Sequence, residues 1–210
     1  MPRRANLFVL LFIPLLLLLV PAAGAQNTDD TVRSVEQHYR ELRDLRAKVV
    51  QKNFLKSLGK TQTFEGMLWI KKPGKLRLEY TNGQLIVVDG RAALFYSKKS
   101  EQVIKKSFSD VEQMNIPVAF LLGAGHISDS FDVRSVSGRG RVELVPRKAG
   151  AAMKKLTLAA DANGRITELT IYDRSGNITE IRFSEDRENS GVEDSLFRFV
   201  PPKGTEVIEE

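Results

Sequence analysis

Apolar and polar positions alternate with two different periods along the chain. Between Asp29 and Leu45 apolar residues recur every three or four positions, behind two acidic residues. This spacing predicts one amphipathic helix whose apolar face packs on the rest of the fold. From Lys48 onward the period becomes two, which predicts short strands over most of the remaining chain. We expect these strands at 48–57, 61–72, 75–81, 84–89, 92–97, 101–107, 130–137, 141–146, 153–160, 166–173 and 177–184.

Turn residues separate these strands at regular intervals. Asn82-Gly83, Asp89-Gly90, Asn163-Gly164 and Ser175-Gly176-Asn177 each join two strand-like runs. Such sequences favour hairpins, because the turn needs a positive φ that glycine and asparagine adopt most easily. The pattern predicts a mainly β fold, built as a meander of antiparallel strands.

One segment interrupts the strand pattern. The run from Ile116 to Gly123 does not alternate, and Pro117 stands where the first turn of a helix accepts proline. It predicts a short apolar helix that covers part of the sheet, because so short a helix is not stable alone. A simple plug of the core explains the same residues.

The first 25 residues have the pattern of an export signal. Arg3 and Arg4 precede an apolar run, and Ala23-Gly24-Ala25 has the small residues of a signal-peptidase site. We predict a signal peptide over 1–25 that is cleaved after Ala25, and a single domain over 26–210. A membrane anchor is the alternative, but prolines interrupt the run, which is shorter than the roughly 20 residues that span a bilayer.

Composition narrows the possible partners. The chain has no cysteine, so it carries neither a disulfide nor the lipid that bacterial lipoproteins bear on an N-terminal cysteine. Lys and Arg number 32 against 26 Asp and Glu, but the cations come as scattered pairs such as Lys71-Lys72 and Lys98-Lys99. Nucleic acid is therefore not an expected partner. The pairs indicate a solvated sheet face, with a patch for an anionic membrane as the alternative.

Signatures of catalysis and metal binding are missing from the sequence. His38 and His126 lie outside any known catalytic motif, and we interpret both as surface histidines. We therefore predict no enzyme activity, no metal site and no cofactor. Large apolar residues occupy both alternating sets between Phe64 and Phe95. Strands of this kind are buried on both faces, or they share one face with a lipophilic ligand.

Several runs stand in an order that is specific as a set. They are FEGMLWIKKPGKLRLEY from Phe64, QLIVVDG from Gln84, Phe95-Tyr96, Pro117 to Leu122, VELVPR from Val142 and FRFVPPKG from Phe197. This ordered set resembles the outer-membrane lipoprotein carrier family, LolA, over nearly all of residues 26–210. The resemblance implies an incomplete β-barrel: an antiparallel sheet curled around an apolar cavity, with an N-terminal helix and short lid helices.

The resemblance also implies a function. A member of this family is a monomeric periplasmic chaperone that accepts lipoproteins released by an inner-membrane ABC transporter. It shields their acyl chains and delivers them to an outer-membrane acceptor. Two alternatives remain at this level: a carrier of another amphiphile, such as a phospholipid or glycolipid, and a secreted enzyme or structural β protein without a lipid ligand.

The family pattern suggests site residues. Lys72 occupies the position of a basic residue, usually arginine, that hydrogen-bonds the lid of the closed carrier, and a solvated turn lysine is the alternative. The sequence does not fix which alternating set of strand residues faces the cavity. By size and family position, the candidates for the cavity and lid are Met67, Trp69, Leu76, Leu78, Phe95, Phe120 and Leu121.

Overall fold

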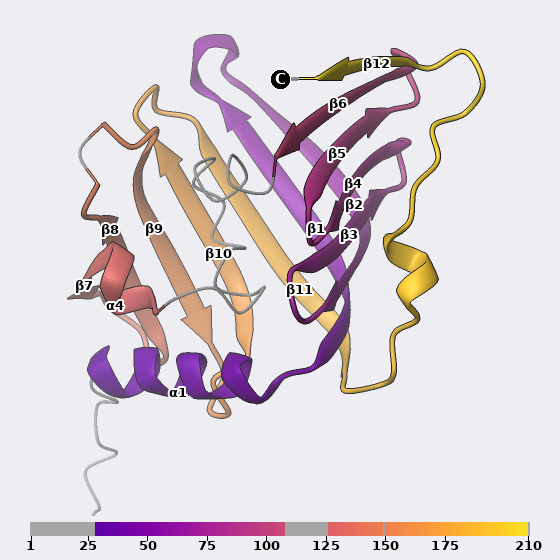
Figure 1. The fold of residues 1–210 in the computed structure, drawn as a ribbon. Coiled ribbons are helices and arrows are strands. Elements are labelled where there is room, and N and C mark those ends of the chain that lie inside the picture. Colours follow the sequence, from indigo (N-terminus) through magenta and orange to yellow (C-terminus); the bar gives the residue numbers. More distant parts are fainter. Residues whose placement is uncertain (1–27, 108–125, 149, 210) are drawn as a thin grey trace, which may run out of the picture.

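One long helix lies across the end of a curled sheet of twelve strands (Figure 1). A computed structural model describes residues 28–107, 126–148 and 150–209. The helices are α1 (Thr28–Glu41), α4 (Ile127–Ser130) and the 3-10 turns η1 (Lys56–Leu58) and η2 (Asp194–Phe197). The strands are β1 (Asp44–Leu55), β2 (Lys60–Lys71), β3 (Lys75–Tyr80), β4 (Gln84–Asp89), β5 (Ala92–Ser97), β6 (Gln102–Ser107), β7 (Phe131–Ser135), β8 (Arg141–Pro146), β9 (Met153–Ala160), β10 (Ile166–Asp173), β11 (Ile178–Glu188) and β12 (Glu206–Glu209).

The strands follow the order β12-β6-β5-β4-β3-β2-β1-β11-β10-β9-β8-β7 in one sheet. β12 and β7 are its two edges, and the sheet curls so that its two halves face each other across a concave side (Figure 1). The predicted mainly β architecture, a curled open sheet with an N-terminal helix, is confirmed. One detail differs, because β12 pairs with β6 in parallel and the sequence pattern did not predict a strand there.

The predicted strands agree with β1 to β11 to within a few residues. The bounds 84–89, 92–97, 141–146, 153–160 and 166–173 are identical to those observed. The reason is the turn chemistry, since Gly83 and Gly164 adopt φ values of 86° and 80° at the predicted hairpins.

The predicted helix is too long at its C-terminal end. α1 ends at Glu41, and Leu45 lies in β1, where it pairs with Ile70 of β2 and Glu188 of β11. Main-chain pairing on both sides replaces the helical hydrogen bonds that these residues would otherwise form. Leu45 is only 5% exposed, so its apolar side chain reaches the core from the strand just as it would from a helix.

The core fills the concave side of the sheet beneath α1. Directly paired residues of neighbouring strands point to the same face, so the register defines that face across the whole sheet. Ala47 pairs with Leu68, and Val142 with Leu158, and all four side chains are buried. α1 adds its own buried stripe, made of Val32, Val35 and Tyr39.

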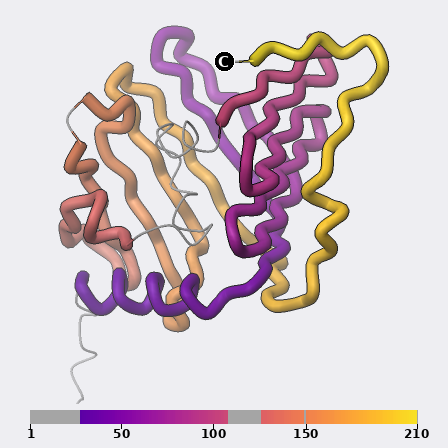
Figure 2. Tube along the Cα trace, in the orientation of Figure 1, coloured from indigo at the N-terminus to yellow at the C-terminus, as the bar shows by residue number. Residues whose placement is uncertain are grey.

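The C-terminal segment covers the opposite, convex face of β3 and β4. In Figure 2 this segment, in yellow, runs along the outside of the sheet. Phe197 of η2 is 2% exposed, and the Leu196 carbonyl accepts a hydrogen bond from Nη1 of Arg77 at 3.2 Å. The rings of Tyr96 and Phe199 lie 5.2 Å apart. This cover explains why both alternating sets of residues are apolar in this part of the sheet, and it confirms the burial of both faces.

Two predicted segments lie outside the described residues: the signal peptide over 1–25 and the short helix from Ile116 to Gly123. Within residues 28–107, 126–148 and 150–209, no helix is long and apolar enough to cross a membrane.

Candidate functional site

The register places three of the predicted cavity residues on the concave face. Leu76 pairs with Ile70, and Leu78 with Leu68, both of which belong to the buried core. Phe95 pairs with Ile86, the residue that also pairs with Leu78. The structure therefore brings Leu76, Leu78 and Phe95 together on the side that α1 faces.

Met67 and Trp69 lie on the opposite face of β2. Met67 is paired with Lys48 and Glu79, whereas Trp69 is paired with Arg46 and Arg77. Their cross-strand partners are charged, and they lie on the convex face, opposite the main core. We therefore keep Leu76, Leu78 and Phe95 as cavity candidates and do not keep these two. The other two candidates, Phe120 and Leu121, lie outside the described residues.

The concave face continues beyond the packed core as a set of partly exposed apolar side chains. These residues come from strands in both halves of the curled sheet and pack against the buried core. Sequence alternation identified their strands, but it gave no reason to choose the residues of β7, β10 and β11 over those of any other strand. The set comprises Leu78, Ile86, Phe95, Phe131, Val133, Ala160, Ile171, Ile181 and Phe183.

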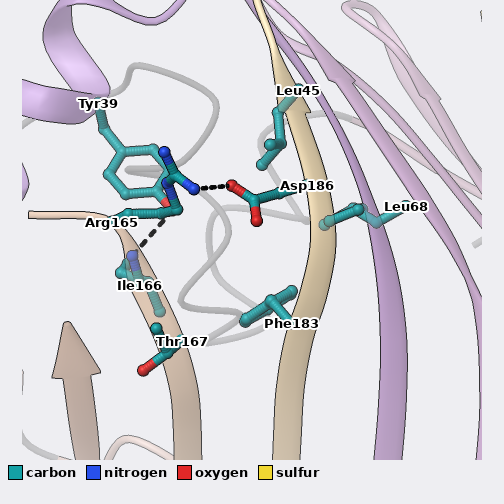
Figure 3. A pocket seen from close by; sticks show the side chains of 9 residues that line it. Tyr39, Leu45, Leu68, Arg165, Ile166, Thr167, Phe183 and Asp186 are labelled. Carbon is teal, nitrogen blue, oxygen red and sulfur yellow. Dashed lines mark hydrogen bonds and ion pairs between the residues drawn. The ribbon is translucent and has the colours of Figure 1, made fainter. Parts of the chain in front are cut away.

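A small cavity lies where the C-terminal end of α1 meets this face (Figure 3). Its volume is about 30 Å³, which is room for no more than one or two water molecules. It is a gap between helix and sheet, too small to enclose an acyl chain. Its lining residues are Tyr39, Leu45, Ala47, Leu68, Arg165, Ile166, Thr167, Phe183 and Asp186.

Tyr39 fixes α1 to the sheet at this cavity. Its hydroxyl accepts a hydrogen bond from the backbone N–H of Ile166 at 3.4 Å (Figure 3). Burial raises the pKa of Tyr39 far above its usual value, so the hydroxyl stays neutral at any physiological pH. The ring thus gives α1 an apolar body in the core and a hydrogen bond to β10.

A chain of hydrogen bonds and ion pairs supports the same end of α1. Nε2 of His38 lies 2.9 Å from Glu188, which in turn lies 3.1 Å from Nε of Arg165. Nη1 of Arg165 lies 2.6 Å from Asp186 (Figure 3). The interpretation of His38 as a surface histidine is wrong, because its side chain is only 15% exposed and links the helix to β11. The sequence could not show this, since Glu188 is 150 residues away. His126 is 53% exposed, as expected.

Lys72 joins the end of β2 to the last turn of α1. Its ammonium donates a hydrogen bond to the backbone carbonyl of Tyr39, and its backbone N–H donates to the carbonyl of Arg43 at 2.9 Å. A cation at this position complements the negative end of the helix dipole. Burial lowers the pKa of Lys72. The residue predicted as a latch therefore holds α1, whereas any contact with residues 116–123 lies outside the described part of the chain.

No group of three or more His, Asp or Glu side chains that could hold a metal ion occurs among the described residues. The carboxylate of Asp161, which begins a loop with some likeness to a calcium site, accepts hydrogen bonds from the backbone N–H groups of Asn163 and Arg165 at 2.9 and 3.0 Å. These bonds close a turn between β9 and β10.

The chain is similar to known proteins in sequence and in fold. The family described as outer membrane lipoprotein carrier protein LolA matches residues 40–200. An outer-membrane lipoprotein carrier protein from Chromobacterium violaceum is 32% identical over 155 residues, which is 71% of this chain and 74% of the relative. An outer-membrane lipoprotein carrier protein from Nitrosospira multiformis is 29% identical over 184 residues, which is 85% of this chain and 88% of the relative. An uncharacterized conserved protein from Thermus thermophilus shares the fold, with a TM-score of 0.52 at 14% identity over 87% of this chain and 98% of that one.

Proposed function

Because the chain belongs to the LolA family of outer-membrane lipoprotein carrier proteins, we propose that it binds lipoprotein acyl chains on its concave face and carries them through the periplasm to the outer membrane. Carriers of this family are periplasmic and are not enzymes. The observation that supports the proposal is the set of partly buried apolar side chains, among them Leu78 and Phe95, on the concave face of a curled sheet.

Transfer energetics explain why such a surface is needed. Each methylene removed from water is worth roughly 0.8 kcal/mol, so one long acyl chain left in the periplasm costs on the order of 10 kcal/mol. A carrier must offset most of this cost and still release its cargo. Contacts that hold α1 over the sheet, such as the hydrogen bond from the Lys72 ammonium, are each weak enough to open reversibly.

We also propose how the protein reaches the periplasm and which membrane partners it meets there. Residues 1–25 have the pattern of a signal peptide cleaved after Ala25, which would deliver a monomeric domain of residues 26–210 to the periplasm. An inner-membrane ABC transporter would load this domain with lipoprotein, and an outer-membrane acceptor would unload it.

Native mass spectrometry of the protein recovered from its own periplasm tests the proposed function. We expect a bound species with the mass of a triacylated polypeptide. A bound phospholipid or glycolipid would instead identify a carrier of another amphiphile. Empty protein that also fails to take lipoprotein from spheroplasts would overturn the carrier function.

Replacing Lys72 with methionine tests the contact with α1. Lys72→Met keeps the length of the side chain and removes the donor to the Tyr39 carbonyl. We expect a loss of about 1 kcal/mol in the free energy of unfolding and a several-fold faster release of a fluorescent fatty acid. Lys72→Arg should restore slow release, because arginine also donates to a carbonyl. Lys98→Met, in an exposed turn, is the matched control, and release at the parental rate from Lys72→Met would reduce Lys72 to a surface lysine.

A further inference from the structure

A cleft at the junction of α1 and β1 is lined by more cationic than acidic residues. It is open to solvent and has a volume of about 670 Å³. Four of its lining residues are cationic and two are acidic. The lining comprises Arg40, Glu41, Leu42, Arg43, Asp44, Lys71, Lys72, Asn189 and Gly191.

Both acidic residues of the cleft already have partners within the protein. Asp44 is 6% exposed, and its two carboxylate oxygens accept the backbone N–H groups of Ser190 and Gly191 at 2.8 and 3.2 Å. Glu41 accepts a hydrogen bond from Nε2 of Gln37 at 3.2 Å on the outer side of α1. Asp44 in particular serves the loop after β11 and has little capacity left to pair with a cation in the cleft.

The two lysines are also engaged, but the two arginines are not. Nζ of Lys71 donates to the Val192 carbonyl at 2.8 Å and lies 3.1 Å from Asp194, and Lys72 holds the Tyr39 carbonyl. The exposed guanidinium groups of Arg40 and Arg43 make no hydrogen bond or ion pair with any residue that the structure describes.

The main chain that carries these arginines is held in place. The backbone N–H of Arg43 donates to Oδ1 of Asn189 at 2.8 Å, and the carbonyl of Arg43 accepts the backbone N–H of Lys72 at 2.9 Å. Arg40 stands on the last turn of α1. Two arginines without a side-chain partner among the described residues thus line one cleft, on main chain that is held in place.

We propose that this cleft is a docking site for an acidic segment of a partner protein. The inference rests on the proposed function, because a carrier must recognise a partner at the start and at the end of its route. Guanidinium groups bind carboxylates through two parallel hydrogen bonds, and arginine is enriched at protein interfaces for this reason. The cleft is also much larger than a single small anion needs.

The surroundings of the cleft favour a protein over a membrane surface. Membrane-binding surfaces combine cations with exposed apolar side chains that enter the lipid. Among the described residues, the large exposed hydrophobic side chains are Leu58, Val200 and Val207, and none of them lines the cleft. Leu42, the aliphatic residue that does, is only 3% exposed.

Docking at this cleft would weaken the hydrogen bond by which Lys72 attaches α1 to β2. Lys72 lines the cleft and at the same time donates to the Tyr39 carbonyl. A carboxylate is a stronger acceptor for an ammonium group than a neutral carbonyl is. An acidic segment in the cleft therefore competes for Lys72 and weakens the attachment of α1 to the end of β2.

The test uses a fluorescein-labelled peptide of eight glutamates, whose binding to the mature protein is followed by anisotropy. We expect Arg40→Gln combined with Arg43→Gln to weaken binding about tenfold or more, because both bidentate contacts are lost. The matched control is Arg33→Gln with Arg182→Gln, which removes the same charge from side chains that are 75% and 61% exposed and lie outside the cleft. The control should bind within about twofold of the parent, since distant surface charges are screened.

Several outcomes would overturn the docking site. Equal weakening by the two double variants would show attraction to net charge alone. If the double variant at Arg40 and Arg43 lost binding to phosphatidylglycerol vesicles but bound the peptide as the parent does, the cleft would be a membrane contact. Binding of inorganic phosphate by the parent protein, without any binding of the peptide, would identify a site for a small anion.

A second readout separates this inference from the proposed function. In the same samples, uptake of a fluorescent fatty acid should be equal in the parent and in the variant at Arg40 and Arg43. Failure of the parent to take up the fatty acid would refute the carrier function, whereas uptake without peptide binding would refute the docking site alone. Bound peptide should also speed fatty-acid release several-fold from the parent but not from Lys72→Met. An unchanged rate in the parent would refute the competition for Lys72.

Discussion

Replacing Leu78 with glutamate should weaken the binding of acyl chains by at least about tenfold. The sheet of this variant should still fold. Leu78 lies on the concave face between Leu68 and Ile86 and is only partly buried. In the empty protein a carboxylate at this position keeps access to water. An acyl chain would cover it, and burying an unpaired charge costs several kcal/mol.

Met67→Glu is the matched control for this prediction. Met67 stands on the neighbouring strand but on the convex face, where it is paired with Lys48. A glutamate there should leave affinity within about twofold of the parent. Titration with a fluorescent fatty acid measures binding, and circular dichroism reports the fold. Loss of affinity in Met67→Glu but not in Leu78→Glu would place the binding surface on the convex face and refute our assignment.

Replacing Gly66 with alanine should lower the free energy of unfolding by about 3 kcal/mol. A Cβ at Gly66 would lie 2.3 Å from the carbonyl oxygen of Glu79 and 3.1 Å from the Cα of Tyr80. Both atoms belong to the main chain of β3, which pairs with β2 on one side and with β4 on the other. The clash is therefore relieved only by moving one strand away from another.

Gly150→Ala separates this clash from the general cost of losing a glycine. Gly150 has a φ of 78°, and apart from its two chain neighbours no residue comes within 4 Å of the position that its Cβ would take. Only backbone strain is expected there, worth about 1 kcal/mol. Urea unfolding followed by circular dichroism measures both variants. A Gly66→Ala protein no less stable than Gly150→Ala would show that β2 and β3 separate freely at this point.

Local chemistry allowed the elements to be predicted closely. Asn82-Gly83 and Asn163-Gly164 stop one strand and start the next, so the bounds of β4 and β10 followed from the sequence. The large residues on both alternating sets, such as Leu85 and Ile86, correctly indicated burial on both faces. β12 was missed because its pairing partner, β6, lies about a hundred residues earlier, and a four-residue edge strand has almost no pattern of its own.

The candidate site was predicted less completely, because the two faces of a strand cannot be told apart when the residues on both are apolar. A period of two separates Trp69 from Leu68 and Ile70, but it does not say which set faces the cavity, since both sets are apolar. That choice depends on the direction in which the sheet curls and on what covers each face. Here α1 covers the concave side with Tyr39, and the C-terminal segment covers the convex side with Phe197.

The sequence by itself determined the strands and hairpins, the amphipathic helix and the likeness to lipoprotein carriers, and it suggested Lys72 as a candidate latch. Each of these depends on residues that are neighbours along the chain or on an order of motifs. The tertiary structure decided the inward face, the attachment of Lys72 to the Tyr39 carbonyl, the pairing of His38 with Glu188 and the cationic cleft beside α1. These features join residues that are tens to more than a hundred positions apart, and only the closing of β1 against β2 and β11 brings them within contact distance.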